Sequence, residues 1–445
     1  MMTSVTLFEY SPVWNYKEDP VGRRLALKKN VWLWNHYATD MAVNQGGRHY
    51  WFAENLKKQG YEPVIFCANT FHSDREPIDL GHKKYRVEIV DEIPFVYVKT
   101  KPAKGNSIAR VLNMALFYKN LFPVAKDYAQ KHGKPNVIIA SSVHPLTMVA
   151  GIQVVKKFGV SCICEVRDLW PEAIFAFGKT KEASLLGRML VRGEHWIYKN
   201  ADAMIFTKEG DVDYIKERKW DTNQGGDIDL GKCYYINNGV DLESFDKSVL
   251  EYPLEDQDLE ADKCNVIYTG AIRPVNNVGN ILDAAKLLKN ETDIQFLIYG
   301  AGNQEGELRK RVIEEDLPNV KLKGRVNKAH IPYILSKSSV NLLNYSHTQY
   351  NWTRGNSSNK LFEYMASGKP IISTVKMGYC ILDKYGCGIT LDQNTPEDLA
   401  KAIMHIRNMP KERYETMGHN GRRGSENFDF RVLTKKLIDV IDSVF

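Results

Sequence analysis

The sequence predicts an α/β protein made of two doubly wound domains, each with a mostly parallel sheet covered by helices on both faces. The chain has 445 residues, which is too long for one ordinary core and suits two domains of about 200 residues. Short apolar runs alternate with helical patterns, as expected of parallel strands joined by crossover helices. The alternation stops at an acidic stretch, 246–263, and then starts again. We therefore expect two domains that face each other across a cleft.

The first domain is predicted to span residues 1–245. Its strands are short runs rich in Val, Ile and aromatic residues, which lie near 30–36, 62–68, 136–142, 161–167, 201–207 and 233–239. Helical patterns lie between them at 47–60 and over a long stretch, 106–133. Residues 1–28 precede the first clear strand, so we expect them to form an arm or a lid.

The second domain is predicted to span residues 264–428, after an acidic linker at 246–263 that shows no apolar periodicity. Its predicted strands lie at 265–271, 294–300, 319–325, 339–345, 369–375 and 386–392. Residues 429–445 form an amphipathic helix with no strand after it. We expect this last helix to pack back across the domains.

Composition places the protein among ordinary globular proteins. Hydrophobic residues make up 43% and charged residues 26%, and no apolar run reaches the ~18 residues that a membrane span needs. The first 20 residues lack the basic and apolar regions of a secretion signal. The seven cysteines form no CxxC pair and no zinc-site spacing with histidine. These features predict reduced thiols and a cytoplasmic protein.

Positive charge is concentrated in one region. The net charge is +6, but residues 101–200 hold 15 Lys and Arg against 6 Asp and Glu. Such a region suits an anionic partner, either nucleic acid or a membrane surface, although a solvated lysine-rich helix surface is the alternative. Nucleic acid is disfavoured because there is neither aromatic interleaving on strands nor a helix-turn-helix pattern.

The predicted helix 106–133 combines apolar and basic side chains in a way that suits a membrane interface. A plain helix that covers the sheet is the alternative. The residues concerned are Leu112, Leu116, Phe117, Leu121 and Phe122 with Lys101, Lys104, Arg110 and Lys119.

A glycine-rich turn, "IQFLIYGAGNQEGELRK", carries Gly300, Gly302 and Gly306 and is similar at first sight to a dinucleotide-binding turn. A dinucleotide site needs a carboxylate at the end of the next strand, about 20 residues further on. Here that strand ends in Lys323, Gly324 and Arg325, so NAD is disfavoured. Two alternatives stay open: an anion site at a helix N-terminus, or glycines that only allow close packing.

The segment "RGNSSNKLFEYMASGKPIIST", residues 354–374, predicts a helix whose N-terminus faces the cleft. Ser357, Ser358 and Asn359 are N-cap residues, and Gly368 ends the helix. A diphosphate suits such an N-terminus, with Lys360 adding charge on the first turn. Glu363 lies one turn further and can accept hydrogen bonds from a ribose diol. Any capped helix carries similar residues, which is the simpler alternative.

Taken together, these motifs resemble the retaining family 4 glycosyltransferases, which have the GT-B fold of two Rossmann-like domains. "YTGAIR", "YGAGNQEGELRK", the segment at 354–374 and "INNGVDLESF" carry the resemblance, which covers roughly residues 30–445. "SSVHPLTMVAG" and "EVRDLWPEAIFAFG" resemble the branch of bacterial surface-polysaccharide transferases that includes the fucosamine transferases. The resemblance implies a nucleoside-diphosphate sugar donor, no metal and no other cofactor, with Gly302 and Asn303 in a turn that faces the donor.

Two departures from the family pattern concern the donor site. The family signature has two glutamates, and the position of the first is Gly355 here. The family also tends to place an Arg and a Lys after the first glycine of the second domain to hold the diphosphate. Here Arg273 is present, Asn276 or Asn277 replaces the lysine, and Lys360 or Arg325 is expected to compensate.

Candidate residues of the first domain follow its strands and open its first helix. His144 follows the strand at 136–142, at the edge where open α/β sheets bind ligands; it is expected to contact the donor or assist the acceptor proton. Asp168 is expected to act as an acceptor contact or base, or to hold the loop with Arg167. Gly46 and Gly47 are expected to allow close approach of the backbone to the donor. The residues expected to contact the acceptor are Arg48, His49 and Glu165.

The resulting prediction is a retaining, hexosyl-type transferase that moves a sugar from UDP, or from GDP as second choice, to a growing bacterial surface glycan such as O-antigen or capsule. The acceptor is expected to be an oligosaccharide or to be linked to polyprenyl diphosphate, with the enzyme peripheral on the inner face of the cytoplasmic membrane. The alternatives are a nucleotide-sugar 2-epimerase of the same fold and a non-catalytic partner that only binds a nucleotide sugar. The catalytic candidates are His144, Asp168, Arg273 and Lys360.

Overall fold

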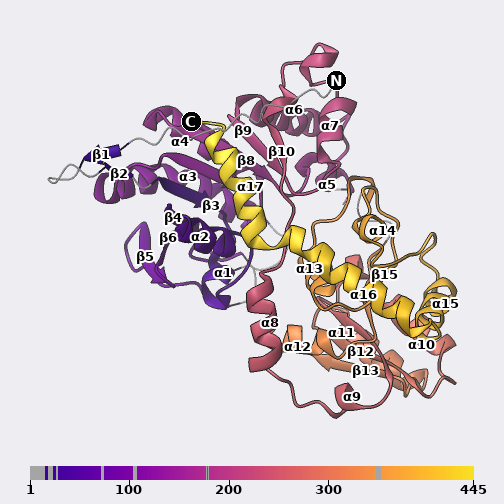
Figure 1. Ribbon diagram of the computed structural model, residues 1–445. Helices are drawn as coiled ribbons and strands as arrows, with labels where there is room; N and C mark the ends of the chain where they lie inside the picture. The colour runs from indigo at the N-terminus through magenta and orange to yellow at the C-terminus, as the bar shows by residue number, and fades with distance from the viewer. Residues whose placement is uncertain are drawn as a thin grey trace, which may run out of the picture.

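The computed structural model describes residues 16–18, 24–26, 29–71, 75–103, 108–176, 178, 180–346 and 352–445. It shows two α/β domains side by side, with the C-terminal helix returning from the second domain to the first (Figure 1). The predicted fold class is confirmed. Most of residues 1–28, and Lys104 of the proposed membrane surface, lie outside the described residues.

The first domain is built on an eight-stranded sheet with the order β10-β9-β8-β7-β3-β4-β6-β5. All neighbours are parallel except β5 and β6, which form an antiparallel hairpin at one edge. The strands are β3 (Asn30–Trp34), β4 (Glu62–Ala68), β5 (Tyr85–Val90), β6 (Ile93–Val98), β7 (Val137–Ser141), β8 (Ser161–Val166), β9 (Ala203–Phe206) and β10 (Cys233–Tyr235). A separate pair, β1 (Tyr16–Glu18) and β2 (Arg24–Ala26), lies within the predicted arm.

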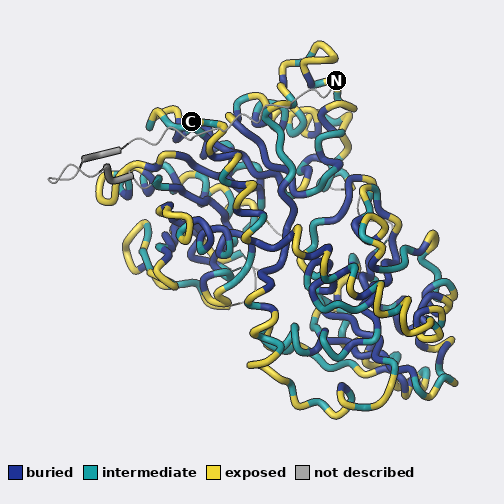
Figure 2. The backbone as a smooth tube through the Cα atoms, in the orientation of Figure 1, coloured by how far each residue is buried: buried dark blue, intermediate teal, exposed yellow. Residues whose placement is uncertain are grey.

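Helices cover both faces of this sheet, and the central strands are buried apart from their first residues (Figure 2). The helices are α1 (Thr39–Asn44), α2 (Arg48–Lys58), α3 (Ile108–His132), α4 (Pro145–Phe158), α5 (Trp170–Ala176), α6 (Leu185–Asn200) and α7 (Asp211–Glu217). In the described part of the chain, no helix is both long and apolar enough to cross a membrane.

The second domain has six parallel strands in the order β13-β12-β11-β14-β15-β16. They are β11 (Cys264–Thr269), β12 (Ile294–Tyr299), β13 (Val320–Gly324), β14 (Val340–Leu343), β15 (Ile371–Ser373) and β16 (Gly388–Thr390). The helices around them are α10 (Val278–Leu287), α11 (Glu305–Glu314), α12 (Ile331–Ser336), α13 (Asn359–Ala366), α14 (Ile381–Tyr385), α15 (Pro396–Arg407) and α16 (Lys411–Ser425).

The stretch predicted as a linker, 246–263, contains regular structure. Helix α8 (Leu242–Glu251) enters it and α9 (Gln257–Glu260) follows. Leu242, Phe245 and Val249 place an apolar stripe on α8 that packs in the second-domain core beside α12 and α13. Two of these three residues precede position 246. Residues 246–263 taken alone therefore show no helical period of apolar residues.

The final helix, α17 (Phe430–Asp442), packs on the first domain although it follows the second in the chain. Its apolar stripe of Phe430, Leu433, Leu437, Val440 and Ile441 joins the first-domain core. The rings of Phe430 and Phe52 of α2 meet edge to face, with centroids 5.4 Å apart. The predicted crossover of the C-terminal helix is confirmed.

Candidate functional site

The two domains enclose a cleft of about 490 Å³. The first domain contributes the loop before α2, including Gly46 and Gly47, and the second contributes 327–329 with Asn359 and Glu363 of α13. Four predicted donor residues, two from each domain, therefore share one cavity. Arg273, Lys360, Gly302, Asn303 and Arg325 lie outside its lining.

Helix α2 begins at this cleft without a side-chain cap. Its N-cap is Gly47, whose φ of 108° strongly favours glycine. A Cβ at Gly47 would also lie 3.1 Å from Cγ of Met41. The first N–H groups of a helix have no partner within the helix. Because α2 is uncapped, these N–H groups and the positive end of the helix dipole both face the cleft.

Helix α13 begins on the opposite side of the cleft and is also uncapped. Ser358 is its N-cap residue, as predicted, but its side chain does not cap the helix. The Ser358 hydroxyl instead accepts a hydrogen bond from the Tyr345 hydroxyl at 2.7 Å. Further along the helix, the Glu363 carboxylate lies 3.8 Å from the Lys328 ammonium.

Lys360, on the first turn of α13, lies between two aromatic rings. Its ammonium is 4.7 Å from the centroid of Tyr268 and 4.9 Å from that of Tyr345. Burial lowers the pKa of Lys360 to about 7. Its Nζ would be 3.1 Å from a Cβ at Gly270, which has a φ of 149°. Lys360 therefore lies against the loop after β11, and its charge is sensitive to pH near neutrality.

The glycine turn that opens α11 is explained by close packing. A Cβ at Gly300 would lie 1.8 Å from the Gly270 carbonyl oxygen, and one at Gly302 would lie 2.0 Å from that of Ile272. The loops after β11 and β12 thus touch through their backbones, and Ile272 N donates to the Ala301 oxygen at 3.0 Å. Gly302, Asn303, Arg325 and Arg273 are exposed around these loops.

The two departures from the family pattern have a conformational basis. Gly355 has a φ of 102°, a region that other residues adopt only with strain. The Asn276 amide donates to the Ala271 oxygen at 2.7 Å, and Asn277 is in the left-handed conformation at the start of α10. Both asparagines shape the turn, so neither replaces the expected lysine as a cation.

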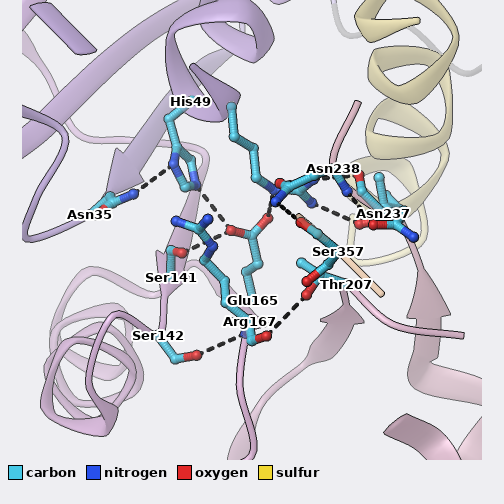
Figure 3. A network of polar contacts seen from close by, with 12 residues as sticks. Asn35, His49, Ser141, Ser142, Glu165, Arg167, Thr207, Asn237, Asn238 and Ser357 are labelled. Atoms are coloured by element: carbon cyan, nitrogen blue, oxygen red, sulfur yellow. Dashed lines mark hydrogen bonds and ion pairs between the residues drawn. The ribbon is translucent and has the colours of Figure 1, made fainter. Parts of the chain in front are cut away.

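A buried network of polar side chains lies behind the first-domain wall of the cleft (Figure 3). Glu165, at the end of β8, pairs with Arg48 Nε at 2.7 Å and with His49 Nε2 at 3.2 Å, and it accepts from the Ser141 hydroxyl at 2.8 Å. Burial opposes ionisation of Glu165, but Arg48 and His49 outweigh it and hold the pKa of this carboxyl well below its usual range. The side chains of Arg48, His49 and Glu165 are at most 2% exposed.

These three residues were predicted to contact the acceptor. Arg48 lines the cleft, whereas His49 and Glu165 lie behind it. The Arg48 guanidinium also donates to the carbonyl oxygens of Ile236 at 2.9 Å and Asn237 at 2.5 Å. Because their polar groups face partners inside the protein, these side chains hold the wall of the cleft in this structure. Burial lowers the pKa of His49, and Arg48 is the strongest of the groups that keep Glu165 ionised.

The network continues into the second domain through two asparagines (Figure 3). The Asn237 amide donates to the Asn356 oxygen at 2.9 Å, and the Asn238 amide donates to the Ser357 oxygen at 2.5 Å. Arg48 also donates to Asn238 Oδ1 at 3.3 Å. The first-domain network is thus joined to the loop that precedes α13. Sequence reasoning assigned these asparagines no role, although the tandem pair directly after the last strand was a signal.

His144 and Asp168 lie together in a different cavity, of about 350 Å³, within the first domain. His144 is 1% exposed, and its Nε2 is 2.6 Å from His36 Nδ1. Burial lowers the pKa of His144 to about 3, so this imidazole is neutral at pH 7. Asp168 is exposed and lies 3.2 Å from the Lys208 ammonium.

Comparisons with known proteins agree with this architecture. A family model described as glycosyl transferases group 1 matches residues 254–424, and one described as glycosyl transferase 4-like domain matches residues 46–224. The chain is also similar to a probable glycosyltransferase, WbjE, of Pseudomonas aeruginosa, with 23% identity over 300 residues, which are 65% of this chain and 70% of that protein.

The chain is a glycosyltransferase of the GT-B type.

Solved structures show the same fold at low sequence identity. A sucrose-phosphate synthase from Thermosynechococcus elongatus matches this glycosyltransferase with a TM-score of 0.66 and 19% identity, over 93% of this chain and 98% of that one. The HepE protein of Anabaena, solved in complex with UDP, matches with a TM-score of 0.63 and 14% identity, over 92% of this chain and 98% of that one.

The cleft of this glycosyltransferase brings two uncapped helix N-termini to one cavity, α2 from one domain and α13 from the other. Each contributes partial positive charge, and in the part of the chain that the structure describes neither N-cap side chain accepts a hydrogen bond from the first N–H groups of its helix. Glu363 adds a carboxylate at the same wall. The arrangement suits an elongated ligand with an anionic middle and hydroxyl groups on either side.

Proposed function

We propose that the protein is a retaining, hexosyl-type transferase that takes its sugar from a UDP-sugar and builds a bacterial surface polysaccharide. The observation that carries this proposal is the pair of uncapped helix N-termini facing one interdomain cleft. The complex of HepE with UDP supports UDP over GDP, and the similarity to WbjE supports a glycan product. The acceptor is a polyprenyl-diphosphate-linked sugar, and the enzyme is peripheral on the inner face of the cytoplasmic membrane.

The donor diphosphate binds at the N-terminus of α13. In this scheme Lys360, on the first turn of that helix, and Arg273, in the loop after β11, neutralise the charge that develops on the leaving group. Glu363 accepts hydrogen bonds from the ribose hydroxyls. Gly46 and Gly47 allow the sugar to approach the backbone of the first domain. No metal or other cofactor is needed in this scheme, because helix dipoles and cations supply the positive charge.

Binding of the donor is tested by thermal stabilisation of the purified protein with UDP, GDP, NAD and their sugar conjugates. We expect UDP to raise the midpoint of unfolding, and Glu363→Ala to abolish most of that shift. Glu314→Ala is the matched control, since Glu314 is also a second-domain glutamate paired with a lysine, Lys310, at 3.4 Å. Stabilisation by NAD alone would overturn the proposal, and stabilisation by GDP alone would change the donor base.

Product analysis then separates transfer from the two alternatives. Anomeric NMR of the glycoside formed from a UDP-sugar and a short lipid-linked acceptor shows whether configuration is retained. An isomerised nucleotide sugar would indicate an epimerase. Binding without any product would indicate a non-catalytic partner, the alternative that the absence of the first signature glutamate at Gly355 leaves open.

A further inference from the structure

The cavity that holds His144 and Asp168 also has Glu194 in its wall, whose carboxyl oxygens accept from the Tyr198 and Tyr214 hydroxyls, and the rest of the wall is mostly apolar. The cavity lies between α3, α4, α5 and α6, and Met114, Leu146, Val149, Ile174, Met189 and Leu190 line it. Its polar end is formed by His144 and Asp168, which follow neighbouring strands of the sheet. An amphiphilic ligand matches this division, with hydroxyl groups at one end and hydrocarbon along the rest.

His144 carries a polar atom that has no protein partner. Its Nε2 is occupied by His36, whereas its Nδ1 is buried and makes no hydrogen bond within the described residues. An unsatisfied buried group of this kind costs free energy, and such groups often mark places where a ligand completes the bonding. Since His144 also lines the cavity, the polar part of a ligand belongs beside it.

The helices on either side of the cavity continue into an exposed apolar surface. Met114 of α3 and Met189 of α6 line the cavity, and the first turns of the same helices expose large apolar side chains. Among the described residues, 14 large apolar side chains are exposed, and six of them lie here: Ile108, Val111, Leu112, Leu185, Leu186 and Met189. Exposed apolar side chains gathered in this way mark an interaction surface.

Charge on the two helix starts is positive. Between Ile108 and Lys119, α3 has two basic residues and no acidic one, and the first eight residues of α6 add the exposed Arg188 and Arg192 with no acid. Basic residues interleaved with exposed apolar ones match an anionic lipid surface, because the charges attract headgroups while the apolar side chains enter the interface.

We propose that this cavity binds the isoprenoid chain of a polyprenyl-diphosphate-linked acceptor. The sugar end of the acceptor lies at His144 and Asp168, the hydrocarbon passes Met114 and Met189, and the first turns of α3 and α6 rest in the membrane from which the chain comes. This inference rests on the proposed function, because it identifies the acceptor of the same transferase.

A substitution at Gly193 tests whether the cavity binds the isoprenoid chain. Gly193 lines the cavity, and a Cβ built there meets no atom within 4 Å. Gly193→Phe is therefore expected to fill the cavity without a backbone clash, and the helical position gains propensity when glycine is replaced. Gly193→Ala makes the same backbone change without filling the space.

The experiment is calorimetric titration of the full-length protein with farnesyl diphosphate in the presence of saturating UDP, which occupies the donor cleft. We expect saturable binding to wild type, about tenfold or greater loss in Gly193→Phe, and little change in Gly193→Ala. The double variant Leu185→Glu, Leu186→Glu should reduce sedimentation with phosphatidylglycerol vesicles while farnesyl diphosphate still binds.

Equal binding of farnesyl diphosphate to wild type and Gly193→Phe would overturn the proposal, as would the absence of binding to wild type. In either case an intact UDP shift that Glu363→Ala removes would leave the donor assignment standing and point to a free oligosaccharide acceptor. A lost UDP shift would instead show that the proposed function fails at the donor cleft.

Discussion

The two walls of the interdomain cleft use charge in opposite ways. In the first domain, Arg48 and Glu165 are at most 2% exposed and have protein partners for their charged groups. In the second, Glu363 is 20% exposed and its carboxylate lies 3.8 Å from the Lys328 ammonium, and Arg273 and Arg325 are exposed. The buried charged side chains hold the first-domain wall in place, whereas the exposed charged side chains of the second domain are available to a ligand. Charge at a cleft is therefore no guide to ligand contact until burial is known.

The two walls are joined where the buried network reaches the α13 loop. Asn237 and Asn238 donate across the domain boundary to the carbonyl oxygens of Asn356 and Ser357. Through these bonds the loop that orients the N-terminus of α13 is held from the first domain. Substitutions on the two walls should consequently fail differently: those in the buried wall cost stability, and those in the open wall cost ligand affinity.

Breaking the buried pair should produce the largest effect. Arg48→Met removes the main counter-charge of the buried Glu165 and leaves it only His49 and Ser141 as partners, so we expect the free energy of unfolding to fall by about 3–5 kcal/mol. Denaturant unfolding with a probe in the first domain measures this loss of unfolding free energy. Adding Glu165→Gln should recover part of the loss, because the orphaned charge is removed. Lys376→Met, which breaks the exposed pair with Asp392, should change little, and an equally small effect of Arg48→Met would contradict the comparison.

Removing the partly buried cation of the second domain, Lys360, should affect affinity and spare stability. Under the proposed function, Lys360→Met is expected to weaken UDP binding by about 10- to 100-fold, the worth of one charged hydrogen bond. Titration calorimetry measures the loss, and Lys360→Arg should retain most of the affinity. If Lys360→Met bound UDP as wild type does, the diphosphate would lie elsewhere.

The low pKa of Lys360 predicts a pH dependence of UDP binding. Free Lys360 has a pKa of about 7, so it loses its proton above neutrality, and binding of a diphosphate must restore it. UDP affinity should therefore fall as the pH rises from 7 to 9, by at most about tenfold per pH unit. Lys360→Arg keeps its charge throughout, and its affinity should be flat over the same range. A flat profile in wild type would show that the ammonium stays charged without a ligand.

The smallest expected effect concerns the bonds between the walls. Asn238→Ala removes the bond to Ser357, so UDP affinity should drop by about three- to tenfold, the net worth of one hydrogen bond. Asn420→Ala removes a bond of the same type, to the Gly386 oxygen at 3.4 Å, away from the cleft, and should leave UDP binding unchanged. Unchanged binding in Asn238→Ala would mean that α13 is oriented by the second domain alone.

The candidate site was only partly predictable. Gly46, Gly47, Asn359 and Glu363 were predicted from turns and helix starts, and they line one cleft. The buried place of Arg48, His49 and Glu165 was not predicted, because burial depends on Ile236, Asn237 and Asn238, nearly 190 residues further along the chain. His36, the partner of His144, was missed for the same reason.

Local patterns in the sequence determined the elements: alternating apolar runs and helical periods specify two parallel sheets and an amphipathic last helix, because each element must bury its apolar face. The hairpin of β5 and β6 was missed even though Tyr85, Val87 and Ile89 alternate with polar residues. Only the tertiary structure decided which polar side chains are buried with protein partners and which remain exposed to a ligand. Burial, partner and pKa are properties of the packed neighbourhood, and segments distant in the sequence supply that neighbourhood.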